Sequence, residues 1–369
     1  VFSGTSAYPG TRVRVSLSSS ETQQLLSITN GLGVQTTFTY KPLTDSSVYT
    51  KGTGATYPVV DVQYPQYVVS SKTVSNGIGG VFTSSYSYKG LKSHAKGLGS
   101  LGFSEMTTRN DDTGIQTTSY FSQDYANRTQ GMLNRLKTVA DNGTVLSDTE
   151  NTWSTIAVGS GSDTRYRGQL LSTEVTKRDL NNAFLHREMN TYTYDGDDNV
   201  IGTNSTVYDS GSQVLRTRVT TNDYKPTDTN QWLFGLLEKS TVSATVTGQP
   251  TLTRKSSWTY DGTTGRKLTE TLLEPVSETV LSQTSYENID PFGNHQRTVI
   301  SGPDFATRQT DVVYDTTGRF ITSTSNHLGH TATSTYYPDG HINAGQVNTT
   351  TSANGISTYF EYDGFGRNI

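Results

Sequence analysis

Polar and apolar residues alternate along much of this chain, which is typical of β-strands with one covered face. Trp258 and Tyr260 flank Thr259, and since successive strand residues point to opposite faces, the two rings share one face. Residues 12–17 and 82–88 alternate in the same way. The pattern predicts an all-β fold with helix content below about 10%, against roughly a third in average domains.

A short motif recurs within this alternation. Tyr-Asp is followed a few residues later by Gly-Arg in three places, with a looser Tyr-Asp copy before them: Tyr260, Asp261, Gly265 and Arg266; Tyr314, Asp315, Gly318 and Arg319; Tyr362, Asp363, Gly366 and Arg367; and Tyr194 with Asp195. From Tyr260 onward, tyrosines of this kind are spaced by 23 to 28 residues. Such a period indicates a repeat architecture.

Each copy of the motif predicts a strand, a tight turn and a returning strand. The Asp carboxylate can accept hydrogen bonds from backbone N–H groups two residues on, and the Gly supplies a positive φ that a side chain resists. We therefore expect positive φ at Gly265, Gly318 and Gly366, and we expect the Arg to begin the return strand. Because an isolated hairpin is marginal in water, the hairpins must stack on their neighbours.

Two other turns are indicated nearer the start of the chain. Asn30-Gly31 lies between apolar runs, which predicts a hairpin within 23–40. Residues 131–140 fit a helix or a strand, but Asn142-Gly143 after them favours a hairpin.

The motif series resembles the YD repeat of the RHS/YD-repeat superfamily, which includes bacterial polymorphic toxins, the B component of Tc insecticidal toxins and animal teneurins. Residues 28–33, 39–43, 57–58 and 97–103 resemble the pre-repeat region of SpvB-like proteins and of the Tc B component. We accordingly expect a pre-repeat β region at 1–125 and a YD-repeat β ribbon at 126–369 that continues beyond residue 369.

The resemblance implies an architecture and a role. In that superfamily, β-hairpins form a ribbon that spirals into a hollow shell, so this chain is expected to be a structural wall segment. The implied partners are an enclosed C-terminal toxin polypeptide, the remaining shell and a translocation channel. The implied location is extracellular, as part of a secreted bacterial toxin assembly.

Composition agrees with a thin β structure. Hydrophobic residues are 31% and charged residues 17%, while Tyr (22) and Gly (35) are abundant, which favours strands and turns over a single large core. The net charge of −4 and the absence of a basic run give no sign of a nucleic-acid partner. No apolar stretch approaches the roughly 20 residues of a membrane helix. Cysteine is absent, so there are no disulfides or thiolate metal sites.

Four local patterns could carry chemistry, and each is better interpreted as a turn. Residues 97–102 match Gly-x-Gly-x-x-Gly but leave no room for the helix that a dinucleotide site needs. Residues 195–199 begin like a calcium loop but lack its later ligands. His327, His330, Asp339 and His341 have no zinc-like spacing. Residues 290–293 resemble the Asp-Pro-x-Gly motif of RHS self-cleavage sites, yet fall where a repeat turn is due. We predict no catalytic, cofactor or metal residues.

Two alternatives remain open. Rows of exposed Tyr and Trp could make the chain a carbohydrate- or cell-surface-binding module, with a glycan as partner. Paired carboxylates could make it a glycosidase-like enzyme, although a flat repeat ribbon offers no evident deep pocket.

Overall fold

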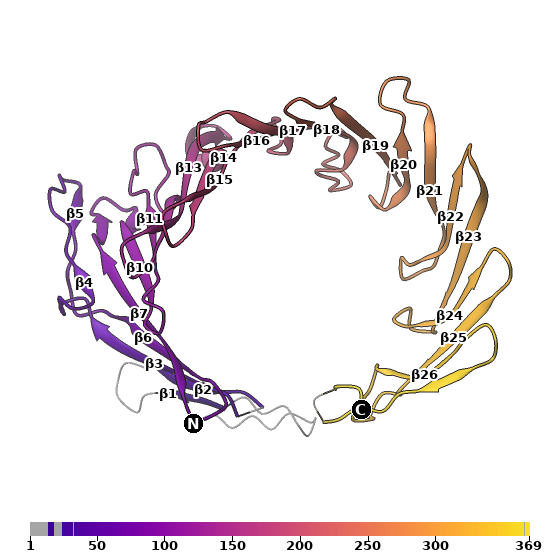
Figure 1. Cartoon of the computed structure of the whole chain (residues 1–369), viewed down its shortest axis with the longest axis horizontal. Helices are drawn as coiled ribbons and strands as arrows, with labels where there is room; N and C mark the ends of the chain where they lie inside the picture. The colour runs from indigo at the N-terminus through magenta and orange to yellow at the C-terminus, as the bar shows by residue number, and fades with distance from the viewer. Residues whose placement is uncertain (1–13, 18–23, 32, 365) are drawn as a thin grey trace. The chain divides into compact units, whose positions relative to one another are not determined.

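The computed structural model describes residues 14–17, 24–31, 33–364 and 366–369 (Figure 1). Almost all regular structure within them is β, and their one helix is the three-residue 3-10 helix η1 (Gly161–Asp163). The all-β prediction is confirmed. The described residues contain no helix with the length and apolar character that crossing a membrane requires.

The chain divides into two compact units. Among described residues, the first unit holds 14–193 and 204–217, and the second holds 194–203 and 218–369. Strands β16 (Val200–Tyr208) and β17 (Val214–Tyr224) run through the division. This division is based on contacts in space, whereas the boundary predicted after residue 125 separates the pre-repeat region from the YD-repeat region. The boundary after residue 125 stays a prediction.

The first unit is built on an antiparallel sheet. Its registers join the strands in the order β1, β2, β3, β6, β7, β10, β11, β12, β13, β14, β15. Strand β4 pairs in parallel with the end of β7, and β5, β8 and β9 form a small second sheet. The bounds are β1 Arg14–Leu17, β2 Leu25–Thr29, β3 Gln35–Pro42, β4 Tyr49–Thr50, β5 Val59–Asp61, β6 Tyr67–Ser75, β7 Val81–Lys89, β8 Lys92–His94, β9 Gly99–Gly102, β10 Glu105–Asn110, β11 Gln116–Phe121, β12 Leu133–Val139, β13 Val145–Val158, β14 Arg165–Arg178 and β15 Phe184–Tyr194.

A compact core lies between β7 and the segments around the small sheet. Leu43, Val48, Tyr49 and Leu91 are buried, with Phe103 packed against them. The Tyr49 hydroxyl donates to the Val62 carbonyl at 2.7 Å and accepts the Leu91 N–H at 3.1 Å. These bonds give hydrogen-bond partners to buried polar groups that water cannot reach. Burial of the hydroxyl also raises the pKa of Tyr49.

The second unit is a meander in which each strand pairs with the next along the chain (Figure 1). Its further strands are β18 Leu237–Val246, β19 Leu252–Tyr260, β20 Lys267–Leu273, β21 Val280–Ile289, β22 His295–Gly302, β23 Phe305–Tyr314, β24 Ile321–Asn326, β25 Thr331–Tyr336, β26 Val347–Thr351 and β27 Ser357–Tyr359. The stacked antiparallel hairpins predicted from the repeat are confirmed.

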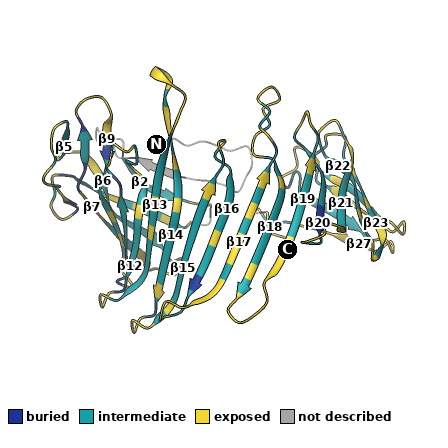
Figure 2. Cartoon of the chain, turned by 90° about the horizontal axis from the view of Figure 1, so that it is seen from above, coloured by how far each residue is buried: buried dark blue, intermediate teal, exposed yellow. Residues whose placement is uncertain are grey.

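The second unit has little buried interior. Of its described residues only Thr271, Leu273 and Asn343 are buried, and its strands are coloured mainly as intermediate or exposed in Figure 2. The low hydrophobic content of the chain thus fits a second unit in which the sheet has no second layer of structure packed on it. Its stability must come from pairing between neighbouring hairpins, because each strand has little apolar area to remove from water.

Most individual hairpin predictions hold. Strands β2 and β3 flank the Asn30 turn, and β12 and β13 flank Asn142-Gly143, so the helix alternative for 131–140 is wrong. The motif Arg does not begin the return strand: Arg266, Arg319 and Arg367 lie in the turns, and β20 and β24 begin after Arg266 and Arg319. Parts of the expected elements at 12–13, 23, 32 and 365 lie outside the described residues.

Candidate functional site

Three of the four patterns that resemble chemical sites fall in turns or loops, and the fourth, expected as a turn, runs on into a strand. Residues 97–98 end the turn after β8, whereas 99–102 are β9 itself, which pairs with β8; residues 195–199 connect β15 to β16. No group of three or more His, Cys, Asp or Glu side chains gathers to hold a metal ion in the described part of the chain. His341 instead stacks on Tyr337, with ring centroids 4.4 Å apart.

The motif Asp organises the turn through its own carboxylate. Asp261 Oδ1 accepts the N–H groups of Thr263 and Thr264 at 3.1 and 2.7 Å. Asp315 Oδ1 accepts those of Arg319 and Phe320 at 2.8 and 3.1 Å. Both carboxylates therefore accept hydrogen bonds from N–H groups of the turn that do not take part in strand pairing.

The motif Gly carries the left-handed residue of that turn. Gly265, Gly318 and Gly366 have φ of 68°, 69° and 76°, as predicted. The Gly318 N–H donates to the Asp315 carbonyl at 3.0 Å, and the Gly366 N–H donates to the Asp363 carbonyl at 2.9 Å. The first copy has one residue more between Asp and Gly, so its bond from Gly265 to Asp261 spans four positions rather than three.

The motif Tyr ends a strand at a bulge. The register shifts between Thr259 and Tyr260 and between Val313 and Tyr314, at the same place in the two repeats. A bulge increases local twist and redirects the strand end. The Tyr260 hydroxyl donates to the Leu237 carbonyl at 2.8 Å, which ties one hairpin to the hairpin before it.

The same turn also occurs where the Asp or Asn is not followed by Gly-Arg. Asp or Asn accepts N–H groups two and four residues on in these turns: Asn76, Asp179, Asp195, Asp209, Asp290 and Asn326. In three of them a non-glycine residue takes the left-handed position, namely Asn182, Asp198 and Ser212. The signal that could have found them is an Asp or Asn between two alternating runs, without a Gly-Arg pair after it.

Successive turns on one side of the second unit contact each other, and we call this series the YD rim: turns 195–199, 261–266, 290–294, 315–320 and 363–367, with the loops 225–236 and 337–346. Each contact uses a Gly surface. A methyl group built on Gly318 would lie 2.4 Å from the Phe292 ring, and one on Gly293 would lie 2.6 Å from the Arg266 guanidinium. The rim Gly is thus needed for close approach as well as for its φ.

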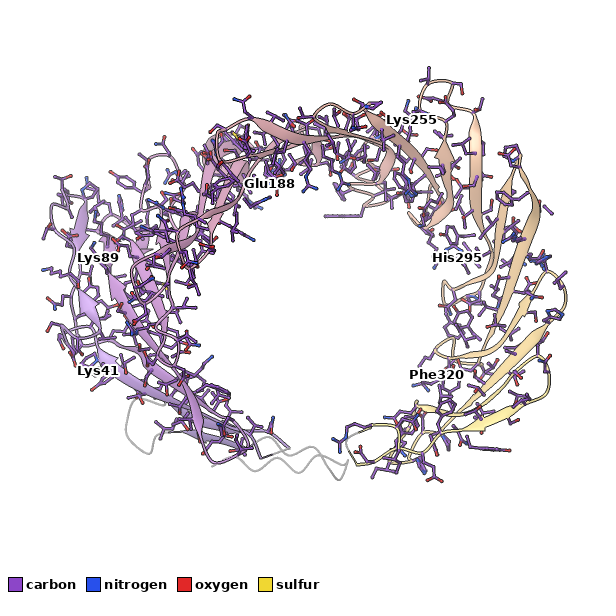
Figure 3. All side chains as sticks on the ribbon, in the orientation of Figure 1. Lys41, Lys89, Glu188, Lys255, His295 and Phe320 are labelled. Atoms are coloured by element: carbon purple, nitrogen blue, oxygen red, sulfur yellow. The ribbon has the colours of Figure 1, made fainter. Side chains whose placement is uncertain are left out.

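The other rim contacts complete the series. Asn294 Nδ2 donates to the Gly318 carbonyl at 2.8 Å. The rings of Phe320, labelled in Figure 3, and Tyr336 are stacked with centroids 4.7 Å apart. A methyl group on Gly265 would meet Leu233, one on Gly345 would meet Phe320, and one on Gly366 would meet Gln346. Each turn therefore packs against the next one along the chain.

The three motif arginines do not share one contact. Arg266 lies against Gly293, and Arg319 reaches Asp339 at 3.4 Å. Arg367 binds Asp363 within its own turn at 2.6 Å. Arg266 and Arg319 thus reach a neighbouring turn, whereas Arg367 closes its own turn.

Carboxylates in the turns are held in the ionised form. Hydrogen bonds from the Thr264 hydroxyl and nearby N–H groups lower the pKa of Asp261. At the opposite edge of the sheet, Glu278 accepts Lys239 and Lys255 at 2.8 and 2.9 Å, and these bonds lower the pKa of Glu278 to about 2. Lys255, labelled in Figure 3, thereby links β19 to the turn before β21.

His295 gives the rim a dependence on pH. Burial, with the nearby charges of Arg266 and Lys267, lowers the pKa of His295 below 6.5. Its ring lies 5.3 Å from that of Tyr286, and its buried Nδ1 has no hydrogen-bond partner.

The unfolded chain binds a proton at His295 more readily than the folded chain does. The stability of the second unit should therefore fall as the pH drops through 6.5 toward the folded pKa. His295→Phe keeps the ring but cannot titrate, so its melting temperature should fall less than that of the unaltered chain between pH 7 and pH 5. Equal falls in thermal melts of the two proteins would show that His295 titrates normally.

Comparisons with known proteins agree with this geometry. Residues 4–134 match the family model described as the insecticide toxin TcdB middle/N-terminal region. No curated protein sequence matches the chain. The fold is similar to the TcdB2–TccC3–TEV crystal structure, with a TM-score of 0.70 and 10% identity over 97% of this chain and 25% of that one.

Two further solved structures give the same result. TcdB2–TccC3 without its hypervariable C-terminal region matches with a TM-score of 0.70 and 12% identity, over 94% of this chain and 24% of that one. The Photorhabdus luminescens Tc holotoxin pore, carrying a TccC3 substitution, matches with a TM-score of 0.70 and 10% identity over the same shares. This chain thus spans about a quarter of the length of the chains that it matches. In sequence over residues 4–134, and in fold over nearly its whole length, it resembles the B component of Tc insecticidal toxins.

Proposed function

We propose that this chain is a non-catalytic wall segment of an RHS/YD-repeat shell. The shell encloses a C-terminal toxin polypeptide, keeps it from solvent and helps to deliver it. Similarity to the TcdB toxin region supports a structural, toxin-associated role. The fold relatives are complexes of TcdB2 with TccC3, one of them a holotoxin pore, which supports a toxin polypeptide and a channel as the partners.

The YD rim is the observation that carries the proposal. Its Asp and Gly residues form turns, and its Phe, Asn and Arg side chains join each turn to the next. Contacts of this kind recur from one hairpin to the next, and each added hairpin can form the same contact with the one before it. They therefore suit a wall that is extended by adding hairpins. The structural role of the motif residues follows from this: they are wall residues.

Protection of the enclosed polypeptide tests the proposal. In the complete toxin assembly that contains this chain, the toxin polypeptide should resist proteinase K while the wall is intact. Gly318→Val, which breaks one rim contact, should make the polypeptide digestible. The matched variant Thr316→Val changes an exposed residue of the same turn and should leave protection unchanged. Rapid digestion of the polypeptide in the unaltered assembly would overturn the role as a wall.

A further inference from the structure

A polar pocket of about 580 Å³ lies in the first unit, away from the YD rim. We call it the Trp153 pocket, and the lining residues that matter here are Asp124, Asn127, Asn134, Trp153, Ser154 and Thr155. Its volume falls within the ~300–1,000 Å³ of small-molecule sites. Neither the repeat motif nor the proposed wall uses these residues.

The pocket exists because neighbouring strands differ in length. Strands β13 and β14 pair from Ser147 to Val158, whereas β12 pairs with β13 only as far as Glu150. The outer part of β13 therefore has no strand beside it on the β12 side. The loop between β11 and β12, residues 122–132, lies there instead, as Thr155 Oγ1 shows by donating to the Asn127 carbonyl at 2.7 Å.

The loop that walls the pocket is closed and internally bonded. The Ser122 N–H donates to the Met132 carbonyl at 2.8 Å, and the Gly131 N–H donates back to the Ser122 carbonyl at 2.8 Å. Asn127 donates to both carboxylate oxygens of Asp124, through its N–H at 3.0 Å and its Nδ2 at 2.6 Å. Arg128 at the tip has a φ of 58°, a strained value for a residue with a side chain. A loop with this many internal bonds can present a fixed set of polar groups.

The lining combines one aromatic ring with acceptors and donors. Trp153 is the only aromatic residue among those lining the pocket. Its Nε1 donates to the Leu133 carbonyl at 2.9 Å, which fixes the ring in the pocket lining. The Asn127 bonds lower the pKa of Asp124, so an ionised carboxylate is among the groups that line the pocket. Asn134 is exposed and can donate or accept.

We propose that the Trp153 pocket binds a saccharide, with one sugar ring against Trp153 and its hydroxyls bonded to Asp124, Asn134 and the hydroxyls of Ser154 or Thr155. A sugar has apolar C–H faces and a rim of hydroxyl groups that donate and accept. An aromatic surface ringed by a carboxylate, an amide and hydroxyls matches both properties. An apolar ligand would form no hydrogen bond with these polar groups.

This differs from the sequence-based idea of aromatic rows along the strands. The Tyr260 hydroxyl of the Trp258–Tyr260 pair is bonded to the Leu237 carbonyl of the neighbouring strand, whereas Trp153 lines a pocket together with polar residues of the loop 122–132. The saccharide site also stands apart from the wall role, because loss of sugar binding would leave protease protection of the enclosed polypeptide intact.

A glycan microarray probed with the whole fluorescently labelled chain tests the proposal. Titration of the best-bound glycan should then give an affinity at least tenfold weaker for Trp153→Ala, and several-fold weaker for Asp124→Asn, which preserves shape. The matched control Trp232→Ala removes an 80% exposed Trp in the other unit and should bind as the unaltered chain does.

Two results would overturn the site. One is that the unaltered chain binds no glycan, either on the array or in saturation-transfer NMR with methyl glycosides at millimolar concentration. The other is a bound glycan whose affinity is unchanged by Trp153→Ala. If melting curves show that Trp153→Ala is unfolded, Asn134→Ala decides instead, since this exposed side chain can be shortened without loss of packing.

Discussion

Gly318→Ala is expected to lower the free energy of unfolding of the second unit by about 2–4 kcal/mol. A side chain at a φ of 69° costs about 1 kcal/mol or more. The added methyl group would lie 2.4 Å from the Phe292 ring, and such overpacking costs a further 1–3 kcal/mol or so. Denaturant melts of the variant and of the unaltered chain measure the difference.

Gly329→Ala is the matched control. Gly329 occupies the same place in an Asn326 turn, with a φ of 81°, but a methyl group there meets nothing within 4 Å. Gly329→Ala should lower the free energy of unfolding only by the cost of a side chain at positive φ, about 1 kcal/mol. Moreover, Gly318→Ala made in a Phe292→Ala background should cost no more than Gly329→Ala. Equal losses for Gly318→Ala and Gly329→Ala in the unaltered background would mean that the rim contact contributes nothing.

The local part of this fold could be predicted from sequence because it depends on near neighbours. A turn Asp bonds backbone groups two to five residues away, and the need for a Gly at positive φ follows from the turn itself. The contact of Gly318 with Phe292 could not be predicted, since it joins residues of different hairpins. It depends on where the bulges at the motif tyrosines place each strand end, and alternation alone does not reveal a bulge.

The motif also missed turns that use the same geometry. Ser212 has a φ of 64° and Asn182 a φ of 65° at the place where other turns have Gly. At Ser212 the side chain itself makes a contact between hairpins, because its Oγ accepts a hydrogen bond from Arg187 Nη1 at 3.3 Å, so Gly is not required there. A search for Gly-Arg therefore finds the rim turns at Asp261, Asp315 and Asp363, and it overlooks the rim turns at Asp195 and Asp290 as well as the turn at Asp209.

The Trp153 pocket was beyond prediction for a different reason. Its existence depends on β13 and β14 being longer than β12, and strand ends are the least certain feature of an alternating pattern. The loop opposite Trp153 reads in sequence as a run of polar residues, and only its closure by Ser122 and Met132 makes it a wall.

Tyr49→Ala is expected to remove about 3–5 kcal/mol from the stability of the first unit. Tyr49 is 3% exposed and sits in the one compact core around β7, with its ring 6.1 Å from that of Phe103. Truncating a large buried aromatic leaves a cavity that its neighbours fill only in part. Hydrogen exchange of β6 and β7 amides measures this loss locally, independent of the second unit.

Tyr49→Phe separates the hydroxyl from the ring. It leaves the Val62 carbonyl and the Leu91 N–H without their shared partner and should cost about 1–3 kcal/mol. Tyr64→Phe is the matched control, because Tyr64 is 45% exposed and its hydroxyl reaches only the Gln66 side chain; it should cost almost nothing. If the β6 and β7 amides exchange hydrogen at the same rate in both Tyr→Phe variants, the Tyr49 hydroxyl contributes nothing to the stability of the first unit. Water would then satisfy the Val62 and Leu91 backbone groups in its place.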